Sequence, residues 1–224
     1  MKTLERKRIE RPVVIPAGPV RLSGDVAIPA GAEGLVLFAH GSGSSRFSPR
    51  NRMVAAELRR AGAGTLLFDL LTDREAGNRA RVFDIPLLAE RLSYATSWAL
   101  AEPDLHGLRI GYFGASTGAA AALAAAARRD SPIGAIVSRG GRPDLAADAL
   151  PKVAAPTLLI VGANDATVLD LNRSAFDRLI CHKRLEIVPR ATHLFEEPGA
   201  LERVAEVAAE WFTQYLRMKK AQEG

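Results

Sequence analysis

The residues best suited to chemistry centre on one pentapeptide, GASTG at 114–118, which has the pattern G-x-S-x-G. An apolar run at 108–113 precedes it, and an alanine-rich stretch at 118–127 follows it. A serine on a sharp turn between a strand and a helix is a nucleophile elbow, in which flanking glycines relieve crowding. The pattern therefore predicts Ser116 as a catalytic nucleophile, and the alternative is an ordinary serine in a tight turn.

A serine hydroxyl needs a neighbouring base, and the base needs a third group that orients it. Two histidines follow Ser116 in the chain, His182 and His193. His193 comes just after the apolar run 185–188, so it should lie at the carboxyl edge of a parallel sheet, where the elbow also lies. His182 precedes the same run and should lie at the opposite edge. We therefore expect His193 to be the base.

The acid should lie between the serine and the histidine, again just past a strand. Asp165 ends the segment GAND at 162–165, directly after the apolar run 157–161. Asp144 follows the preceding apolar run, 133–137, and is the alternative. Asp144 also suits the cap of a short helix, because it follows a proline and precedes Leu145. The sequence favours Asp165 as the orienting acid.

An oxyanion formed at Ser116 would need two backbone N–H donors. We expect one from Thr117, the residue after the nucleophile, and the other from Ser42 in the loop HGSGSS at 40–45. A glycine- and serine-rich loop can also bind phosphate, but this one lacks the Lys-Ser/Thr pair of a P-loop and does not match G-x-G-x-x-G. His40 should have a structural role, bonding within the loop.

Arginines follow several of the predicted strands. Arg139 and Arg142 come after the run 133–137, and Arg46 and Arg50 come after the loop 40–45. Arginine binds carboxylates with two parallel hydrogen bonds. Arg139 and Arg142 are therefore candidates to contact an anionic group of a substrate. The alternative is that such arginines pair with nearby aspartates and tie the loops together.

Short apolar runs alternate with helical patterns along the chain, which is typical of a parallel sheet covered by helices on both faces. We predict an α/β-hydrolase fold: a mostly parallel eight-stranded sheet with no large lid domain. The antiparallel strand 20–28 should lie near one edge, after a turn at 16–19. Strands are expected at 13–15, 20–28, 35–39, 65–68, 108–113, 133–137, 157–161 and 185–188, and helices at 48–62, 84–99, after 116, from 167 and from 198. The polar stretch 72–84 should be a loop or a short helix.

Composition limits the alternatives. The chain has 224 residues, 48% of them hydrophobic, which suits a single domain over 1–224 with a basic segment at 1–11 and a polar tail at 218–224. The formal charge of +5 is scattered, so we expect no nucleic-acid partner. One cysteine, no secretory leader and no apolar run near the ~20 residues of a membrane span favour a cytoplasmic protein with no membrane contact. No cofactor or metal is implied, and both monomer and homodimer remain open.

Four segments together resemble one known family: HGSGSS, GASTG, GAND and ATHLFEEPG at 191–199. They look like the dienelactone-hydrolase-like branch of the α/β-hydrolases, over about 13–216. The segments SRFSPRN, FDIPLLAERL and SRGGRPDL are similar to a bacterial subgroup of hydrolases, in some members of which such a domain is fused to a phosphoribosyltransferase. Dienelactone hydrolases proper carry a cysteine nucleophile, whereas this elbow carries Ser116. The single Cys181 lies at the wrong place to replace it.

These observations predict a serine hydrolase that cleaves small or short-acyl carboxylic esters, or lactones, through an acyl-enzyme on Ser116. The partner would be a small acyl substrate. Thioesterase, peptidase and acyltransferase activities can use the same three residues. A different class of function, a non-catalytic binding domain with this fold, is the remaining alternative.

Overall fold

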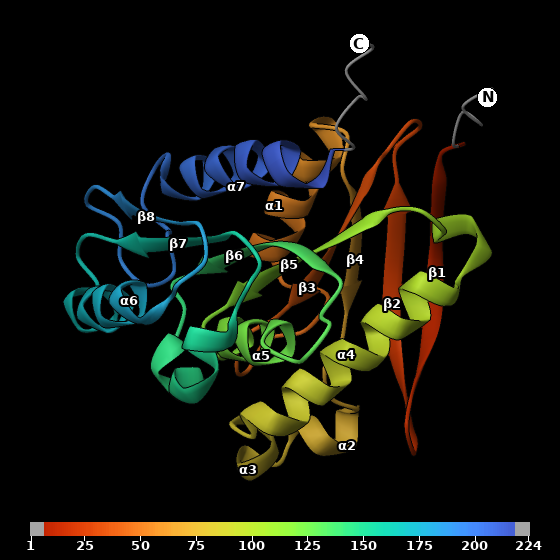
Figure 1. Cartoon of the computed structure of the whole chain (residues 1–224), viewed down its shortest axis with the longest axis horizontal. Helices are drawn as coiled ribbons and strands as arrows, with labels where there is room; N and C mark the ends of the chain where they lie inside the picture. Colours follow the sequence, from red (N-terminus) through yellow and green to blue (C-terminus); the bar gives the residue numbers. More distant parts are fainter. Residues whose placement is uncertain (1–6, 218–224) are drawn as a thin grey trace.

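The computed structural model describes residues 7–217, whose strands form one eight-stranded sheet in the order β1-β2-β4-β3-β5-β6-β7-β8 (Figure 1). The first two strands are antiparallel to their neighbours, and the other pairs are parallel. This confirms the predicted mostly parallel sheet with an antiparallel strand near one edge. The strands are β1 Ile9–Ala17, β2 Val20–Ile28, β3 Gly34–Ala39, β4 Gly64–Phe68, β5 Arg109–Ala115, β6 Ile133–Arg139, β7 Thr157–Gly162 and β8 Lys183–Val188.

Helices cover both faces of the sheet, as predicted for an α/β fold. On one face α1 and α7 pack on each other, and on the other α4 packs on α5 and the 3-10 segment η2 packs on α5 and α6 (Figure 1). Each face has its own apolar core. The helices are α1 Pro49–Arg60, α2 Asp73–Ala76, α3 Arg79–Val82, α4 Ile85–Ala101, α5 Thr117–Ala126, α6 Ala166–Arg178 and α7 Ala200–Leu216, with 3-10 segments η1 Pro103–Leu105 and η2 Pro143–Lys152.

The helix starts follow the sequence signals. Ser48 caps α1 with Pro49 in its first turn, and Asp84 caps α4 by accepting a hydrogen bond from the N–H of Leu87. The last helix begins at Ala200 because Gly199, at a φ of +79°, turns the chain just before it. The polar stretch 72–84 forms two one-turn helices, α2 and α3, so the predicted short helix is present twice.

The first hairpin differs from the prediction. The strand β1 starts at Ile9 and contains Pro12 and Pro16, so the turn is reduced to the residues between Ala17 and Val20. Proline has no N–H to give to a ladder and is tolerated in a strand that has a neighbour on one side alone. The strand β1 lies at the edge of the sheet and pairs with β2, which explains why Pro16 can remain in the strand.

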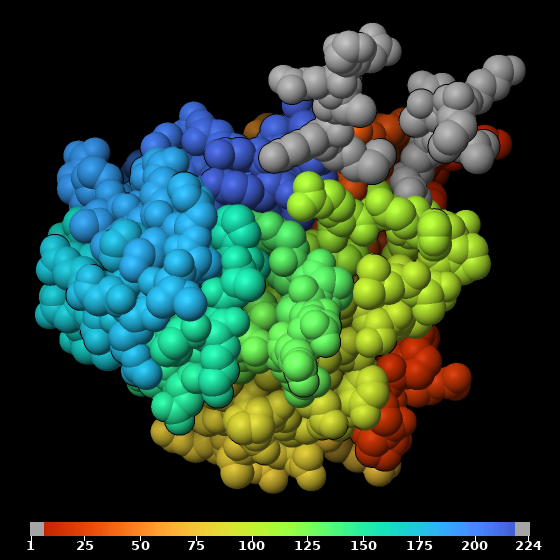
Figure 2. Space-filling view, in the orientation of Figure 1, coloured from red at the N-terminus to blue at the C-terminus, as the bar shows by residue number. Residues whose placement is uncertain are grey.

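No large lid domain is present within residues 7–217, because the connections between strands hold the helices of the two layers and little else. In the space-filling view the yellow segment containing α2, α3 and α4 packs along the lower side of the molecule and forms part of its body (Figure 2). The predicted basic segment 1–11 is described from Lys7 onward, and the predicted polar tail 218–224 lies outside the described residues.

Ser48→Ala tests the start of α1. The Oγ of Ser48 accepts a hydrogen bond from the N–H of Asn51 at 3.3 Å, and loss of such a cap costs about 1 kcal/mol. We expect the free energy of unfolding, measured in urea, to fall by about that amount. Ser93→Ala is the matched control: Ser93 lies inside α4, where alanine is the better helix former, so stability should stay level or rise. Equal losses in both variants would contradict the capping role.

Candidate functional site

Ser116 lies on a strained turn between β5 and α5. Its backbone has φ 51° and ψ −120°, a conformation that L-residues rarely adopt and that costs about 1–3 kcal/mol. The N–H of Ser116 donates to the carbonyl of Arg139 at 3.2 Å, and its own carbonyl accepts from the N–H of Arg142 at 3.1 Å. The segment after β6 therefore holds both peptide groups of the strained residue.

The two glycines of the elbow are required by close backbone contacts. A Cβ on Gly118 would lie 2.1 Å from the carbonyl oxygen of Ala39 and 2.5 Å from that of His40. A Cβ on Gly114 would lie 2.4 Å from the Cα of Ala119. A Cβ on Gly114 would also lie 2.8 Å from the carbonyl oxygen of Gly118, so the two glycines of the elbow crowd each other as well as the start of α5 and the end of β3.

Asp165 and His193 are in direct contact. The Nδ1 of His193 lies 2.6 Å from the Oδ2 of Asp165, and the acid side chain is 14% exposed. Asp165 occupies the N-cap position of α6 but makes no capping bond, so its carboxylate is directed to the imidazole instead. A proton on Nδ1 donates to the carboxylate, which leaves Nε2 as the basic nitrogen.

The contact depends on two loops that are pressed together. The loop after β7 bonds to the loop after β8 through Ala163 N–H to Val188 O and Asn164 N–H to Ala191 O, both 2.9 Å. A Cβ on Gly162 would lie 2.3 Å from the carbonyl oxygen of Ala191, so glycine is required there. Strand β7 pairs with β8 in parallel, and this pairing brings both loops to one edge of the sheet.

His193 also lies against the segment that holds the serine. A Cβ on Gly140 would be 3.2 Å from the His193 carbonyl oxygen and 3.5 Å from its Cε1, and Gly140 follows Arg139 directly. The hydrogen bonds of residues 7–217 join His193 to Asp165 and do not join it to Ser116. Catalytic contacts of this kind often tighten once substrate binds.

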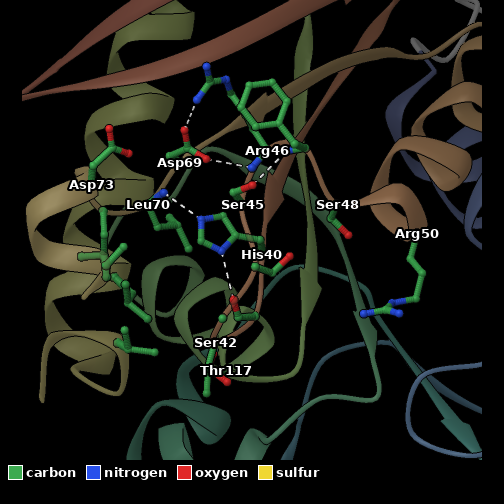
Figure 3. Close-up of a pocket in the computed structure, with 18 of the residues that line it drawn as sticks. His40, Ser42, Ser45, Arg46, Ser48, Arg50, Asp69, Leu70, Asp73 and Thr117 are labelled. Atoms are coloured by element: carbon green, nitrogen blue, oxygen red, sulfur yellow. Dashed lines mark hydrogen bonds and ion pairs between the residues drawn. The ribbon is translucent and has the colours of Figure 1, made fainter. Parts of the chain in front are cut away.

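The loop 40–45 reaches the elbow from β3. A Cβ on Gly41 would lie 3.1 Å from the Cβ of Ser116, so this loop is packed directly on the nucleophile candidate. Ser42 and Thr117 lie close together at one end of the neighbouring cavity (Figure 3). The N–H of Thr117 is in the first turn of α5, where helix amides have no partner within the helix. Both residues expected to supply oxyanion donors thus border one space.

That cavity has a volume of about 680 Å³ and is open to solvent on one side. Its walls come from the loop 40–45, the start of α1 and the segment after β4, with apolar side chains at one end. The apolar lining includes Leu70, Leu71, Val82 and Leu88. A space of this size suits a small ligand.

His40 joins the loop 40–45 to the segment after β4. Its Nδ1 donates to the carbonyl of Gly41 at 3.0 Å, and its Nε2 accepts the N–H of Leu70 at 3.1 Å (Figure 3). Accepting that bond requires a neutral ring, and burial lowers the pKa of His40 below its usual value, although the bond to Gly41 and the charge of Asp69 oppose the shift. The sequence-based expectation that His40 bonds within its loop agrees with these contacts.

The arginines divide into paired and unpaired groups. Arg142 binds Asp144 through two bonds, Nε to Oδ1 at 2.8 Å and Nη2 to Oδ2 at 2.7 Å, and this pairing lowers the pKa of Asp144. Arg46 pairs with Asp69 (Figure 3). For Arg142 the loop-tying alternative therefore describes the structure, because its guanidinium is already occupied by a neighbouring carboxylate.

Asp144 differs from its expected role as a helix cap. The cap position of η2 is Arg142, and Asp144 lies in the first turn with its carboxylate on that guanidinium. The structure brings Asp165, not Asp144, to His193.

Arg139 is a buried cation that forms no ion pair with a carboxylate in the described part of the chain. The residue is 7% exposed, and its Nε and Nη1 have no hydrogen-bond partner among residues 7–217. Its guanidinium lies 5.9 Å from the centre of the Phe195 ring. Burial, with the nearby charge of Arg50, lowers the pKa of Arg139 to about 10, so it stays protonated at neutral pH. Arg50 lines the cavity and contacts Glu196 at 3.2 Å.

Sequence reasoning missed Asn172, a fully buried amide on α6 that bonds to the carbonyl of Gly141. A signal was available: Asn172 interrupts the apolar stripe of that helix between Val168 and Ala175, at spacings of four and three residues. Among residues 7–217, no group of three or more histidine, cysteine, aspartate or glutamate side chains could hold a metal ion, and no helix is long and apolar enough to cross a membrane.

The neutral state of His40 predicts a pH effect on stability. Because its pKa is lowered in the folded chain, the unfolded chain takes up the proton first as pH falls. The stabilisation of the folded chain by a neutral His40 is fully present above pH 6.5 and is lost as pH falls below that value. We expect His40→Gln, which cannot titrate, to show a shallower fall in the free energy of unfolding below pH 6.5, measured by urea titrations at several pH values. Parallel pH curves for the two proteins would contradict the prediction.

Comparison with known proteins places this geometry in a family. None of the known protein-family models matches the chain. A protein of Mycobacterium tuberculosis that bears the provisional name of a phosphoribosyl transferase is 57% identical over 204 residues, which make up 91% of this chain and 46% of that protein. The chain thus spans about half the length of the relatives of that name.

Two solved structures extend the comparison. The crystal structure of dienelactone hydrolase from Anabaena variabilis is 58% identical with a TM-score of 0.91, covering 94% of this chain and 99% of that one. An esterase of Pyrococcus furiosus is 20% identical with a TM-score of 0.80, covering 94% of each chain, and so shares the fold. The high identity over nearly the full length of the Anabaena structure shows that the chain belongs to the dienelactone-hydrolase-like branch of the α/β-hydrolase family.

Proposed function

We propose that this chain is a serine-dependent carboxylic ester hydrolase that acts on small or short-acyl esters, or lactones, through an acyl-enzyme on Ser116. The observation that carries the proposal is the strained φ of 51° at Ser116, on a turn whose supporting segment also contacts the paired His193. Strain of this kind persists where the surroundings enforce it, and it often marks a functional site. The names of the Anabaena hydrolase and the Pyrococcus esterase support the same class of reaction.

In the proposed reaction the Oγ of Ser116 attacks the acyl carbonyl while Nε2 of His193 takes its proton. Asp165 keeps the imidazole in the required tautomer and stabilises its cation. The backbone N–H groups of Thr117 and Ser42 bind the oxyanion of the tetrahedral intermediate. His193 then gives the proton to the leaving alcohol, and in the second half it activates water to release the acid.

The open cavity of about 680 Å³ supports a preference for small substrates. Its apolar side chains can contact a short acyl group, and the described chain has no large lid to enclose a long one. Phosphoribosyl transfer occurs only in the provisional name of a relative of which this chain covers 46%, and the proposal does not draw on that name.

Replacing the proposed triad tests this function. Ser116→Ala should abolish hydrolysis of p-nitrophenyl esters, with wild-type activity highest for short acyl chains. Asp165→Asn should lower kcat by about 10³- to 10⁴-fold because the amide favours the wrong tautomer. Asp144→Asn is the matched control, and it should leave kcat near wild type because Asp144 binds Arg142.

Labelling with a fluorophosphonate probe separates the alternatives. An unreactive wild-type protein would indicate a non-catalytic binding domain. Reaction at Ser116 with no hydrolysis of any ester in the series would direct the search to thioesters or amides. A large loss of kcat in Asp144→Asn, with little loss in Asp165→Asn, would exclude the proposed acid.

We also propose that Arg139 attracts an anionic group on the substrate. A buried guanidinium with two unpartnered nitrogens is costly, and an anion beside it would relieve that cost. Arg139 lies next to the nucleophile turn, since its carbonyl accepts the N–H of Ser116, and Arg50, which is paired with Glu196, borders the cavity nearby. The competing role is a packing one, in which the guanidinium is stabilised by the ring of Phe195.

Arg139→Met separates these roles because methionine keeps an unbranched chain against Phe195 and removes the charge. For a neutral ester and its carboxylate-bearing analogue, we expect kcat/KM to fall about 10- to 150-fold on the anionic ester alone, from the ~1.5–3 kcal/mol of a charge-assisted hydrogen bond. Arg142→Met is the control, since its partner is Asp144. An equal fall in kcat/KM on both esters in Arg139→Met would contradict the anion contact and support the packing role.

A further inference from the structure

Asn172 is a polar side chain in an apolar setting. It lies on α6, is 0% exposed, and its Nδ2 donates to the carbonyl of Gly141 at 3.0 Å and to that of Val168 at 2.8 Å. Its Oδ1 is buried without a hydrogen-bond partner among residues 7–217. Burying an amide with one unpaired oxygen is unfavourable, so the stability of α6 does not explain why an asparagine stands here.

The acceptor of this bond belongs to the segment that holds Ser116. Gly141 lies between Arg139, which accepts the Ser116 N–H, and Arg142, which donates to the Ser116 carbonyl. Gly141 has little freedom to move, because a Cβ there would be 2.0 Å from the Oγ of Ser138 and 2.8 Å from the Cβ of Ala119. A bond to Gly141 therefore acts on the position of the serine turn.

The same segment contacts the base and the strand that leads to the acid. Gly140, at φ +50°, packs on His193, and its N–H donates to the carbonyl of Ile160 in β7 at 2.8 Å. The helix α6 begins directly after Asp165, and Asn172 lies two turns further along it. One rigid helix thus carries the acid at its start and grips the serine-bearing segment through Asn172.

We infer that Asn172 is a positioning residue that fixes the turn of Ser116 relative to Asp165 and His193. Its catalytic consequence rests on the proposed function. The helix α6 begins directly after the acid, and the segment 139–142 bonds to both peptide groups of the serine. Within the described chain, the Asn172 side chain supplies a hydrogen bond from α6 to that segment, so its loss lets the two halves of the site shift against each other.

The test uses Asn172→Leu, which keeps a similar volume and removes the donor, and Asn172→Asp, which keeps the shape and removes the N–H. Thr96→Val is the matched control. It deletes another buried hydrogen bond, between the hydroxyls of Thr96 and Tyr112, in the C-terminal half of α4. Pre-steady-state kinetics with a p-nitrophenyl ester should show acylation about 10- to 100-fold slower in both Asn172 variants, with little change in KM. Thr96→Val should acylate like the wild type.

Hydrogen exchange gives a readout that does not depend on activity. Amides in 139–142 and 116–118 should exchange faster in Asn172→Leu than in wild type or Thr96→Val. Unchanged exchange at these amides in Asn172→Leu would overturn the role of Asn172. Where Ser116→Ala abolishes activity, unchanged acylation in the Asn172 variants would overturn it too. If Ser116→Ala retains wild-type activity, the proposed function fails, while the exchange data still decide whether Asn172 holds the segment.

Discussion

The candidate site depends on the close approach of the turn after β5 to the end of β3. Gly118 lies so near the carbonyls of Ala39 and His40 that no side chain fits between them. This contact presses the start of α5 against the loop 40–45, and Thr117 and Ser42 both border the cavity. The strained backbone of Ser116 is the local cost, and its hydrogen bonds to the segment after β6 offset part of it.

The charged side chains around the site differ in whether they are paired, and Arg139 is the buried one whose charge no carboxylate in the described chain balances. Three aspartates at or near the site are engaged, Asp165 with His193, Asp69 with Arg46 and Asp144 with Arg142, and a fourth, Asp73, lines the cavity. Arg139 keeps its charge in a nearly buried position, beside an aromatic ring and within reach of a second arginine.

Much of this arrangement could be predicted from the sequence because it is encoded locally. The elbow pattern, the strand lengths and the caps at Ser48 and Asp84 are signals within a few residues, and the chain order of parallel strands then assigns residues to one edge. The partners of arginines were not predictable, since Arg142 had both a substrate and Asp144 within reach. Asn172 was missed because its acceptor, Gly141, lies 31 residues away and is a backbone carbonyl, which leaves no mark in the sequence.

The prolines of β1 have a consequence for the surface of the molecule. Pro12 and Pro16 are four residues apart in an edge strand, so both stand at positions whose amide would face outward. A second strand that approaches this edge would find two hydrogen-bond donors of β1 missing, which disfavours β-type pairing there. The opposite edge, β8, has no proline and instead carries charged residues such as Arg184 and Glu186. The two edge strands of the sheet thus disfavour pairing with another strand by different means. In β1 the prolines remove backbone donors, and in β8 the charged side chains oppose association.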